Sequence, residues 1–209
     1  HEPMLQASFG EGFYRLDPGL MFQETAWHTT AGEERFNRND PETARQLLED
    51  AGYDGTPVRF MTTQEYQDHY NTSIVAQQQL EEAGFVVDLQ TYDWATVVER
   101  RADPEAWDVF TTGISFKPDP VQLVILQLCS WPGWWCSDDS QALLDQLSSE
   151  SEFEARFEIW EQLQENFYTE VPMIKVGEEA PIVAKAARVR GLSTQSQLGP
   201  ILWNAWIEE

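Results

Sequence analysis

The sequence predicts an α/β fold, in which helices alternate with short strands along most of the chain. Between residues 40 and 112, segments with apolar side chains at helical spacing are followed by short segments rich in β-branched and aromatic residues. The connections between these segments are short, which favours helices layered on a sheet with some parallel strands. The chain has 209 residues, of which 42% are hydrophobic, so it can build a substantial core.

The segment 40–60 contains signals for both ends of a helix and for the strand that follows it. Asp40 can cap the helix with its carboxylate, and Pro41 suits the first helical position. Gly52 provides the left-handed residue that ends many helices. We therefore expect a helix over 41–52 and a strand over 57–62. The apolar stripe of this helix consists of Ala44, Leu47, Leu48 and Ala51.

The same patterns predict the remaining elements. The first group is a helix over 66–84, a strand over 85–91, a helix over 93–101 and a strand over 107–112. The second group is a short helix over 121–128, a helix from near Asp139, a helix over 152–168, and strands near 171–176 and 181–186. In the helix 66–84, the expected inward residues are Ile74, Val75, Leu80 and Ala83. In the helix 152–168 they are Phe153, Phe157, Trp160, Leu163 and Phe167.

Further motifs follow the helix and strand of 40–60 in a fixed order. They are Gln79–Phe85, Val86–Gln90 running into Tyr92-Asp93-Trp94, Trp107–Phe110, Pro118–Pro120, Val171–Ile174 and Val189–Leu192. In this order they resemble the C-terminal lobe of family 5 extracellular solute-binding proteins, the peptide-binding subunits of bacterial ABC importers. The resemblance covers nearly the whole chain.

The resemblance implies a fold, a function and a domain plan. The fold would be one lobe of a type II periplasmic-binding-protein-like architecture, with a mixed sheet flanked by helices. The protein would capture peptides or a related small solute and deliver them to ABC permease subunits, in the periplasm or outside the cell at the envelope. Family members are more than twice as long, so we expect a lobe fragment that lacks the N-terminal lobe. Residues 1–39 would be an irregular lead-in from the hinge or other lobe, 40–190 the α/β lobe, and 191–209 a tail returning toward the other lobe.

The strongly acidic composition excludes some partners. The formal net charge is −23, from 36 acidic and 13 basic residues. Such a field repels phosphate backbones and anionic lipids, so we expect no nucleic-acid partner. No apolar run is long enough to span a membrane. The charge fits either a solubilising surface or adaptation to a salty habitat.

Motifs for catalysis are largely absent, so we do not expect an enzyme, a cofactor or a metal site. The run from Gly113 to Lys117 begins like a nucleophile elbow but ends in Lys117 where a glycine is needed. The sequence has no H-E-x-x-H motif and no phosphate-binding P-loop. Two alternatives remain open: a hydrolase that uses paired carboxylates, and an acidic protein-interaction domain.

The best candidate for ligand contact is the segment 111–120, which leaves the carboxyl end of a predicted strand. In peptide-binding relatives, an aspartate four residues before the proline pairs with the α-ammonium of the peptide. Here that position is Phe116, whose ring cannot neutralise an ammonium, although it could instead pack in the core. Lys117 could bind a ligand carboxylate or remain solvated. The predicted ligand-contacting residues of this segment are Gly113, Ile114, Ser115, Phe116, Lys117 and Asp119.

The two cysteines enclose a loop rich in tryptophan. An exported protein favours a disulfide between Cys129 and Cys136, with two buried thiols as the alternative. Family members often have a local disulfide at a comparable place, as the resemblance adds. Trp131, Trp134 and Trp135 could form either a wall on which a ligand stacks or a small core around the disulfide.

Overall fold

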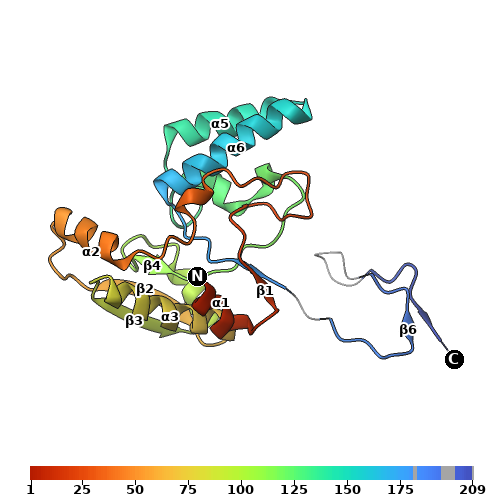
Figure 1. Cartoon of the computed structure of the whole chain (residues 1–209), viewed down its shortest axis with the longest axis horizontal. Helices are drawn as coiled ribbons and strands as arrows, with labels where there is room; N and C mark the ends of the chain where they lie inside the picture. The colour runs from red at the N-terminus through yellow and green to blue at the C-terminus, as the bar shows by residue number, and fades with distance from the viewer. Residues whose placement is uncertain (181–182, 194–200, 209) are drawn as a thin grey trace.

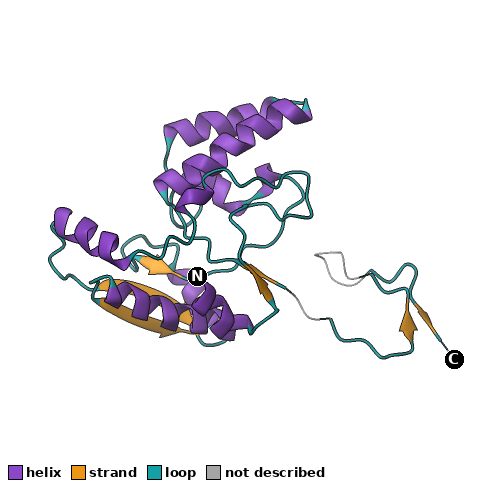
Figure 2. Cartoon of the chain, viewed as in Figure 1, coloured by secondary structure: helices purple, strands orange, loops and turns teal. Residues whose placement is uncertain are grey.

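The structure is a computed structural model that describes residues 1–180, 183–193 and 201–208. Its central sheet has three parallel strands in the order β3-β2-β4 (Figures 1 and 2). The strands are β2 (Val58–Thr63), β3 (Val87–Tyr92) and β4 (Val109–Phe110). In the register, Phe60 of β2 lies opposite both Leu89 of β3 and Val109 of β4. The predicted α/β fold with parallel strands is therefore confirmed, whereas the described central sheet is parallel throughout rather than mixed as the resemblance implied.

Helices pack on this sheet as the alternating pattern predicts. Helix α3 (Gln67–Glu82) contacts β2 and β3, and α4 (Trp94–Arg100) contacts β2. Helix α1 (Glu2–Phe9) packs on α3 and buries Met4 and Leu5 (Figure 1). The expected inner face of α3 is only partly right. Ala83 is buried, whereas the other three expected residues are half-buried, and the most buried side chain of the helix is the polar Ser73.

Helix α2 (Pro41–Asp50) has the predicted ends but not the predicted packing. The Asp40 carboxylate accepts a hydrogen bond from the Thr43 amide at 3.0 Å, and Gly52 has a φ of 71°. None of its residues is buried, and Leu47 is 63% exposed. The caps define the ends of the helix, while its apolar stripe is only partly covered: Ala44 and Leu48 are half-buried, and Leu48 lies near Gly84 after the end of α3.

A second layer is mainly helical. Helices α5 (Asp138–Ser149) and α6 (Phe153–Glu170) run side by side (Figures 1 and 2). The segment predicted as one helix over 121–128 forms two 3₁₀ helices, η2 (Pro120–Gln122) and η3 (Val124–Ser130). The largest hydrophobic cluster lies in this layer. It consists of Met21, Trp27, Leu123, Ile125, Leu126, Leu128, Trp135, Leu147, Trp160, Leu163, Phe167 and Tyr168.

The inward face of α6 is largely as predicted. Trp160, Leu163 and Phe167 are at most 1% exposed, and Phe157 packs against the cluster. Phe153 is the exception, because it is 41% exposed and covers the Trp27 ring from outside at a centroid distance of 4.9 Å. It occupies the first position of the helix, where the core no longer reaches.

The lead-in is more ordered and more buried than expected. Residues 1–39 contain α1, the strand β1 (Tyr14–Arg15) and the 3₁₀ helix η1 (Glu33–Arg35). Buried side chains of α6 donate hydrogen bonds to the irregular main chain of the lead-in. Trp160 Nε1 donates to the Trp27 carbonyl at 2.8 Å. Gln164 Nε2 donates to the Thr29 and Ala31 carbonyls, both at 3.0 Å. The lead-in is thus part of the folded body.

The predicted strands after α6 are mostly wrong. Val171 ends α6 in the left-handed region, with a φ of 51°, and residues 171–176 form no strand. The pairing strand is instead β5 (Glu178–Glu179), antiparallel to β1. Of the strand predicted over 181–186, residues 181 and 182 lie outside the described residues and 183–186 form no strand.

The described part of the tail is an antiparallel hairpin of β6 (Val189–Arg190) and β7 (Trp206–Ile207). It stands clear of the sheet and of the helices (Figure 1). Its apolar side chains are exposed: Trp203 by 91%, Leu202 by 66%, Ile207 by 63% and Trp206 by 54%. The described part of the tail therefore does not pack on the body.

The contrast between two leucines tests this description of the core. Leu163→Ala should destabilise the protein by about 2–5 kcal/mol, because it empties a fully buried position. The control Leu47→Ala on the exposed face of α2 should change the free energy of unfolding by less than about 0.5 kcal/mol. Urea unfolding measures both, and equal losses would contradict the described packing.

Candidate functional site

The carboxyl ends of the three parallel strands meet at one edge of the sheet. Strand β2 ends at Thr63, β3 at Tyr92 and β4 at Phe110. In open α/β sheets this edge is where ligands bind, because the loops that follow the strands converge there. A shallow hollow of about 390 Å³ opens at the edge. It is lined by Gln64, Glu65, Thr91, Tyr92 and Asp93.

The loop that follows β4 contains the predicted ligand-contacting residues and is held firmly at its two ends. At its start, the Thr111 amide donates to the Met61 carbonyl at 3.2 Å, and its hydroxyl lies 2.6 Å from the Ser73 hydroxyl. At its end, the Asp119 carboxylate accepts from the Val121 amide at 3.1 Å. Between these anchors, residues 112–118 form no hydrogen bond with any described part of the chain. Their main-chain donors and acceptors have no partner among the described residues.

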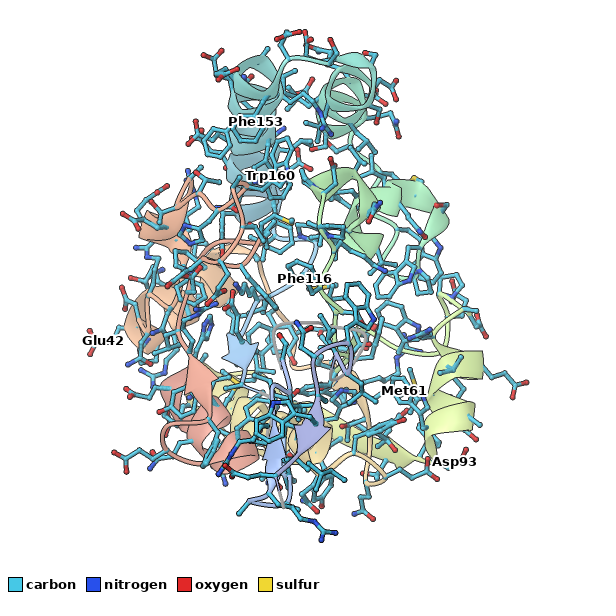
Figure 3. The ribbon with its side chains drawn as sticks, turned by 90° about the vertical axis from the view of Figure 1, so that its right-hand side faces the viewer. Glu42, Met61, Asp93, Phe116, Phe153 and Trp160 are labelled. Carbon is cyan, nitrogen blue, oxygen red and sulfur yellow. A yellow bond between two sulfur atoms is a disulfide. The ribbon has the colours of Figure 1, made fainter. Side chains whose placement is uncertain are left out.

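The side chains of this turn differ in their surroundings. Gly113 and Ser115 are exposed, whereas Ile114 packs on the edge of the hydrophobic cluster. Phe116 is half-buried, and its ring contacts the Phe22 ring at 5.4 Å. In Figure 3, Phe116 lies between the helical layer that carries Trp160 and the sheet that carries Met61. The Phe116 ring is therefore outside the main core.

The two charged residues of the turn have different roles in the fold. Lys117 is half-buried and forms no ion pair with the described residues. Asp119 is bound by Arg156, with contacts of 3.0 Å to each carboxylate oxygen. The Asp119 carboxylate is thus already engaged within the protein, and a ligand contact by it remains only a prediction.

The cysteine loop places its tryptophans in two different surroundings, and the stacking of a ligand on them stays a prediction. Cys129 and Cys136 form the predicted disulfide, with their Cα atoms 4.8 Å apart. Trp135 belongs to the core, and its indole N–H donates to the Glu170 carboxylate. Trp134 stacks on the Trp107 ring at 5.6 Å. One tryptophan is therefore core, while the neighbouring rings line the sheet side of the loop.

An aromatic cluster beside the turn was missed by the sequence reasoning. Tyr66, His69 and Trp94 contact one another with ring centroids 5.2–5.4 Å apart. The Arg101 guanidinium lies 5.8 Å from the Trp94 ring and 5.7 Å from the ring of Trp131. The signal was present, because Tyr66 and Trp94 each follow the carboxyl end of a predicted strand within a few residues.

His69 connects this cluster to the turn. A β-carbon placed on Gly113 would lie 3.6 Å from His69 Nε2, so the imidazole touches the main chain of the turn. The His69 side chain is only 12% exposed, and its Nδ1 atom has no hydrogen-bond partner among the described residues. Burial lowers the pKa of His69, and the nearby Asp68 carboxylate opposes this effect only in part. The lowered pKa favours the neutral form of the imidazole.

In the part of the chain that the structure describes, the buried carboxylates are Asp17 and Glu178, and each is paired with cations or donors rather than with the other. Glu178 lies 2.5 Å from an Arg15 nitrogen and 2.8 Å from Lys175 Nζ. Burial tends to raise the pKa of Asp17, but hydrogen bonds from Gln23, His28 and the Gly19 amide outweigh it and leave that pKa lowered. The arrangement gives the hydrolase alternative no support, since that reaction needs one carboxyl group to stay protonated.

No group of three or more His, Cys, Asp or Glu side chains in the described ranges is placed to hold a metal ion. None of the described helices is both long enough and apolar enough to cross a bilayer.

The burial of His69 predicts a pH dependence of stability. Because its pKa is lower in the folded state, the unfolded chain binds the proton first as the pH falls through about 6.5. This histidine therefore costs stability below that pH. The free energy of unfolding of His69→Asn should decrease less than that of the wild type between about pH 8 and pH 5.5. Urea unfolding at both pH values checks this, and identical losses would contradict a buried, neutral His69.

Comparison with known proteins supports the same architecture. The model of the bacterial extracellular solute-binding proteins, family 5 middle, matches residues 4–134, which is more than half of the chain. A probable peptide ABC transporter periplasmic-binding protein from Sinorhizobium fredii is 26% identical over 215 residues, covering 97% of this chain and 40% of the relative. The chain thus spans less than half the length of this relative.

Solved structures agree in fold. A putative peptide binding protein, AppA, from Clostridium difficile has a TM-score of 0.78 at 16% identity and covers 98% of this chain, which spans 44% of it. The oligopeptide-binding protein AppA from Bacillus subtilis, in complex with a nonapeptide, has a TM-score of 0.76 at 15% identity. The match covers 100% of this chain and 45% of that protein. A dipeptide binding protein from Pseudoalteromonas sp. SM9913, in complex with Met-Leu, has a TM-score of 0.74 at 21% identity. The match covers 99% of this chain and 43% of that protein. The chain has a type II periplasmic-binding-protein-like fold and belongs to the bacterial extracellular solute-binding proteins of family 5.

Proposed function

We propose that this chain forms one ligand-binding wall of an extracellular solute-binding protein that captures peptides, or a related small solute, for an ABC importer. The observation that carries the proposal is the unpaired main chain of 112–118 at the carboxyl edge of the sheet. Main-chain donors and acceptors without partners are costly unless water or a ligand satisfies them. A peptide main chain offers the complementary groups whatever its side chains are.

The surroundings of the turn favour an uncharged ligand group at this position. Phe116 and Phe22 present rings beside it, and the one carboxylate in 111–120 is held by Arg156. A buried ammonium group would need an anion that this turn does not supply. We infer that the ligand reaches 112–118 with main-chain amides or apolar groups rather than with a free α-ammonium.

A second wall is needed to enclose a ligand, and we propose that the tail connects this lobe to the lobe that supplies that wall. The described hairpin of the tail exposes Trp203 and Trp206 without covering the body. Relatives are more than twice as long as the aligned chain. We therefore propose that 191–209 returns toward another lobe and that 40–190, together with the packed lead-in 1–39, forms this one. The similarity to a probable peptide ABC transporter periplasmic-binding protein favours ABC permease subunits as partners and a periplasmic or extracellular location.

The alternative of an acidic protein-interaction domain rests on the exposed aromatic surface of the tail. It would make a protein, rather than a solute, the partner of this chain. The free main chain at the sheet edge favours the solute-binding proposal, because a protein-docking surface does not require an unpaired turn there.

Titration of the ¹⁵N-labelled chain with tri-alanine tests the proposal. Amide shifts should concentrate in 112–118, with a dissociation constant no tighter than about 1 mM because the opposite wall and its closure are missing. The matched control is tri-alanine with N-methylated peptide bonds, which cannot donate the main-chain hydrogen bonds and should shift these amides far less. Equal shifts with both peptides, or shifts elsewhere only, would contradict main-chain capture. Micromolar affinity would contradict the single-wall proposal.

Phe116→Asp tests the inferred absence of an ammonium anchor. The variant should bind tri-alanine with a free N-terminus more tightly, through a charge-assisted hydrogen bond of about 1.5–3 kcal/mol before desolvation is counted. Phe116→Asn is the neutral control, and N-acetylated tri-alanine is the ligand that should gain nothing. The same titration measures all four combinations. An equal gain for the acetylated peptide would show that the new carboxylate does not meet the ammonium.

A further inference from the structure

Arg156 lies on α6, outside the ligand-facing surface, yet it joins four separate parts of the chain. Its Nη1 and Nη2 atoms each lie 3.0 Å from an oxygen of the Asp119 carboxylate. Its Nε donates to the Leu147 carbonyl of α5 at 3.2 Å. The guanidinium carbon lies 4.7 Å from the centre of the Trp27 ring in the lead-in. One planar cation therefore connects α5, α6, the lead-in and the end of the turn.

This arrangement uses properties that only arginine combines. The two parallel contacts to Asp119 use the forked pair of Nη groups of the guanidinium. At the same time its Nε–H binds the Leu147 carbonyl, and its flat face lies over the Trp27 ring. The side chain of Arg156 is 18% exposed and that of Asp119 is 27% exposed. Such partial burial weakens solvent screening relative to a surface pair.

The turn depends on its ends because it has no internal hydrogen bonds. Residues 112–118 are tied at the start by Thr111 and at the end by Asp119. The first anchor lies in the sheet layer, and the second is fixed through Arg156 to the helical layer. Loss of the contact between Arg156 and Asp119 would leave the end of the turn held by the buried Pro120 and the packing of η2 on α5, and the turn itself by the packing of Ile114 and Phe116.

We propose that Arg156 is a positioning residue of the ligand-facing turn: it holds Asp119 so that the free main chain of 112–118 keeps one arrangement. The proposal rests on the proposed function for its biological meaning, but the order of the turn can be measured without a ligand. Preorganisation of this kind favours binding, because the turn need not be ordered when the ligand arrives.

Backbone ¹⁵N relaxation of the 209-residue chain tests the proposal. In the wild type, order parameters in 112–118 should be near those of rigid backbone, about 0.85, and in Arg156→Gln they should fall below about 0.6. The order parameters of α5 and α6 should remain unchanged. Arg156→Lys should restore the turn only in part, because an ammonium cannot make the two parallel contacts together with the bond to Leu147.

Two further variants separate positioning from general stability. Asp119→Asn keeps an oxygen that can cap the Val121 amide but removes the charge, so it should loosen the turn as Arg156→Gln does. If Arg156→Gln fails to fold, Asp119→Asn tests the same contact in its place. Arg59→Gln is the matched control. It removes an exposed pair with Asp108, 2.8 Å apart, at the opposite end of the sheet, and should leave 112–118 ordered.

The outcomes distinguish this proposal from the proposed function. A turn that stays ordered in Asp119→Asn and Arg156→Gln, or that loosens equally in Arg59→Gln, overturns the positioning role. If the turn loosens in both variants as expected, but the 112–118 amides of the wild type do not respond to tri-alanine, the positioning role is supported. The peptide-binding proposal then fails.

Discussion

The body of this protein depends on satisfying the main chain of a partly buried segment that has almost no secondary structure. Residues 17–31 contact α6 and supply Met21 and Trp27 to the hydrophobic core cluster. Buried carbonyls and amides outside helices and sheets need partners. Gln164 provides three of these bonds: it donates to two carbonyls and accepts from the Leu20 amide at 2.9 Å, and Trp160 provides another. These bonds fix the Trp27 ring, and through it the surface on which Arg156 rests.

The parts of the fold that follow from local chemistry were predictable. The caps of α2 and the alternation of helix and strand are properties of short segments, and both are present as expected. The predictions fail where contacts between segments distant in the sequence determine the structure. Residues 171–176 look apolar enough for a strand, but Val171 terminates α6 and the available partner, β1, pairs further along at Glu178. The ordered lead-in escaped prediction because its partners lie on α6, more than a hundred residues away.

The candidate site was predictable in position but not in composition. The turn after β4 could be located because it follows a strand, and the structure places it at the carboxyl edge of the sheet. The rings of Tyr66, His69 and Trp94 come from the starts of α3 and α4, so only the parallel register of β2 and β3 brings them together. Asp119 seemed a ligand contact by its position, yet its partner on α6 could not be inferred from spacing alone.

The free main chain at 112–118 also bears on how such a protein can evolve. Peptide groups are the same whatever side chain a residue carries, so substitutions at exposed positions such as Ser115 leave the donors and acceptors in place. A site that holds its ligand through these groups can change its side-chain preference stepwise without losing capture at any step. The constraint on mutation then lies at the anchors of the turn, and ligand preference can drift while the framework stays fixed.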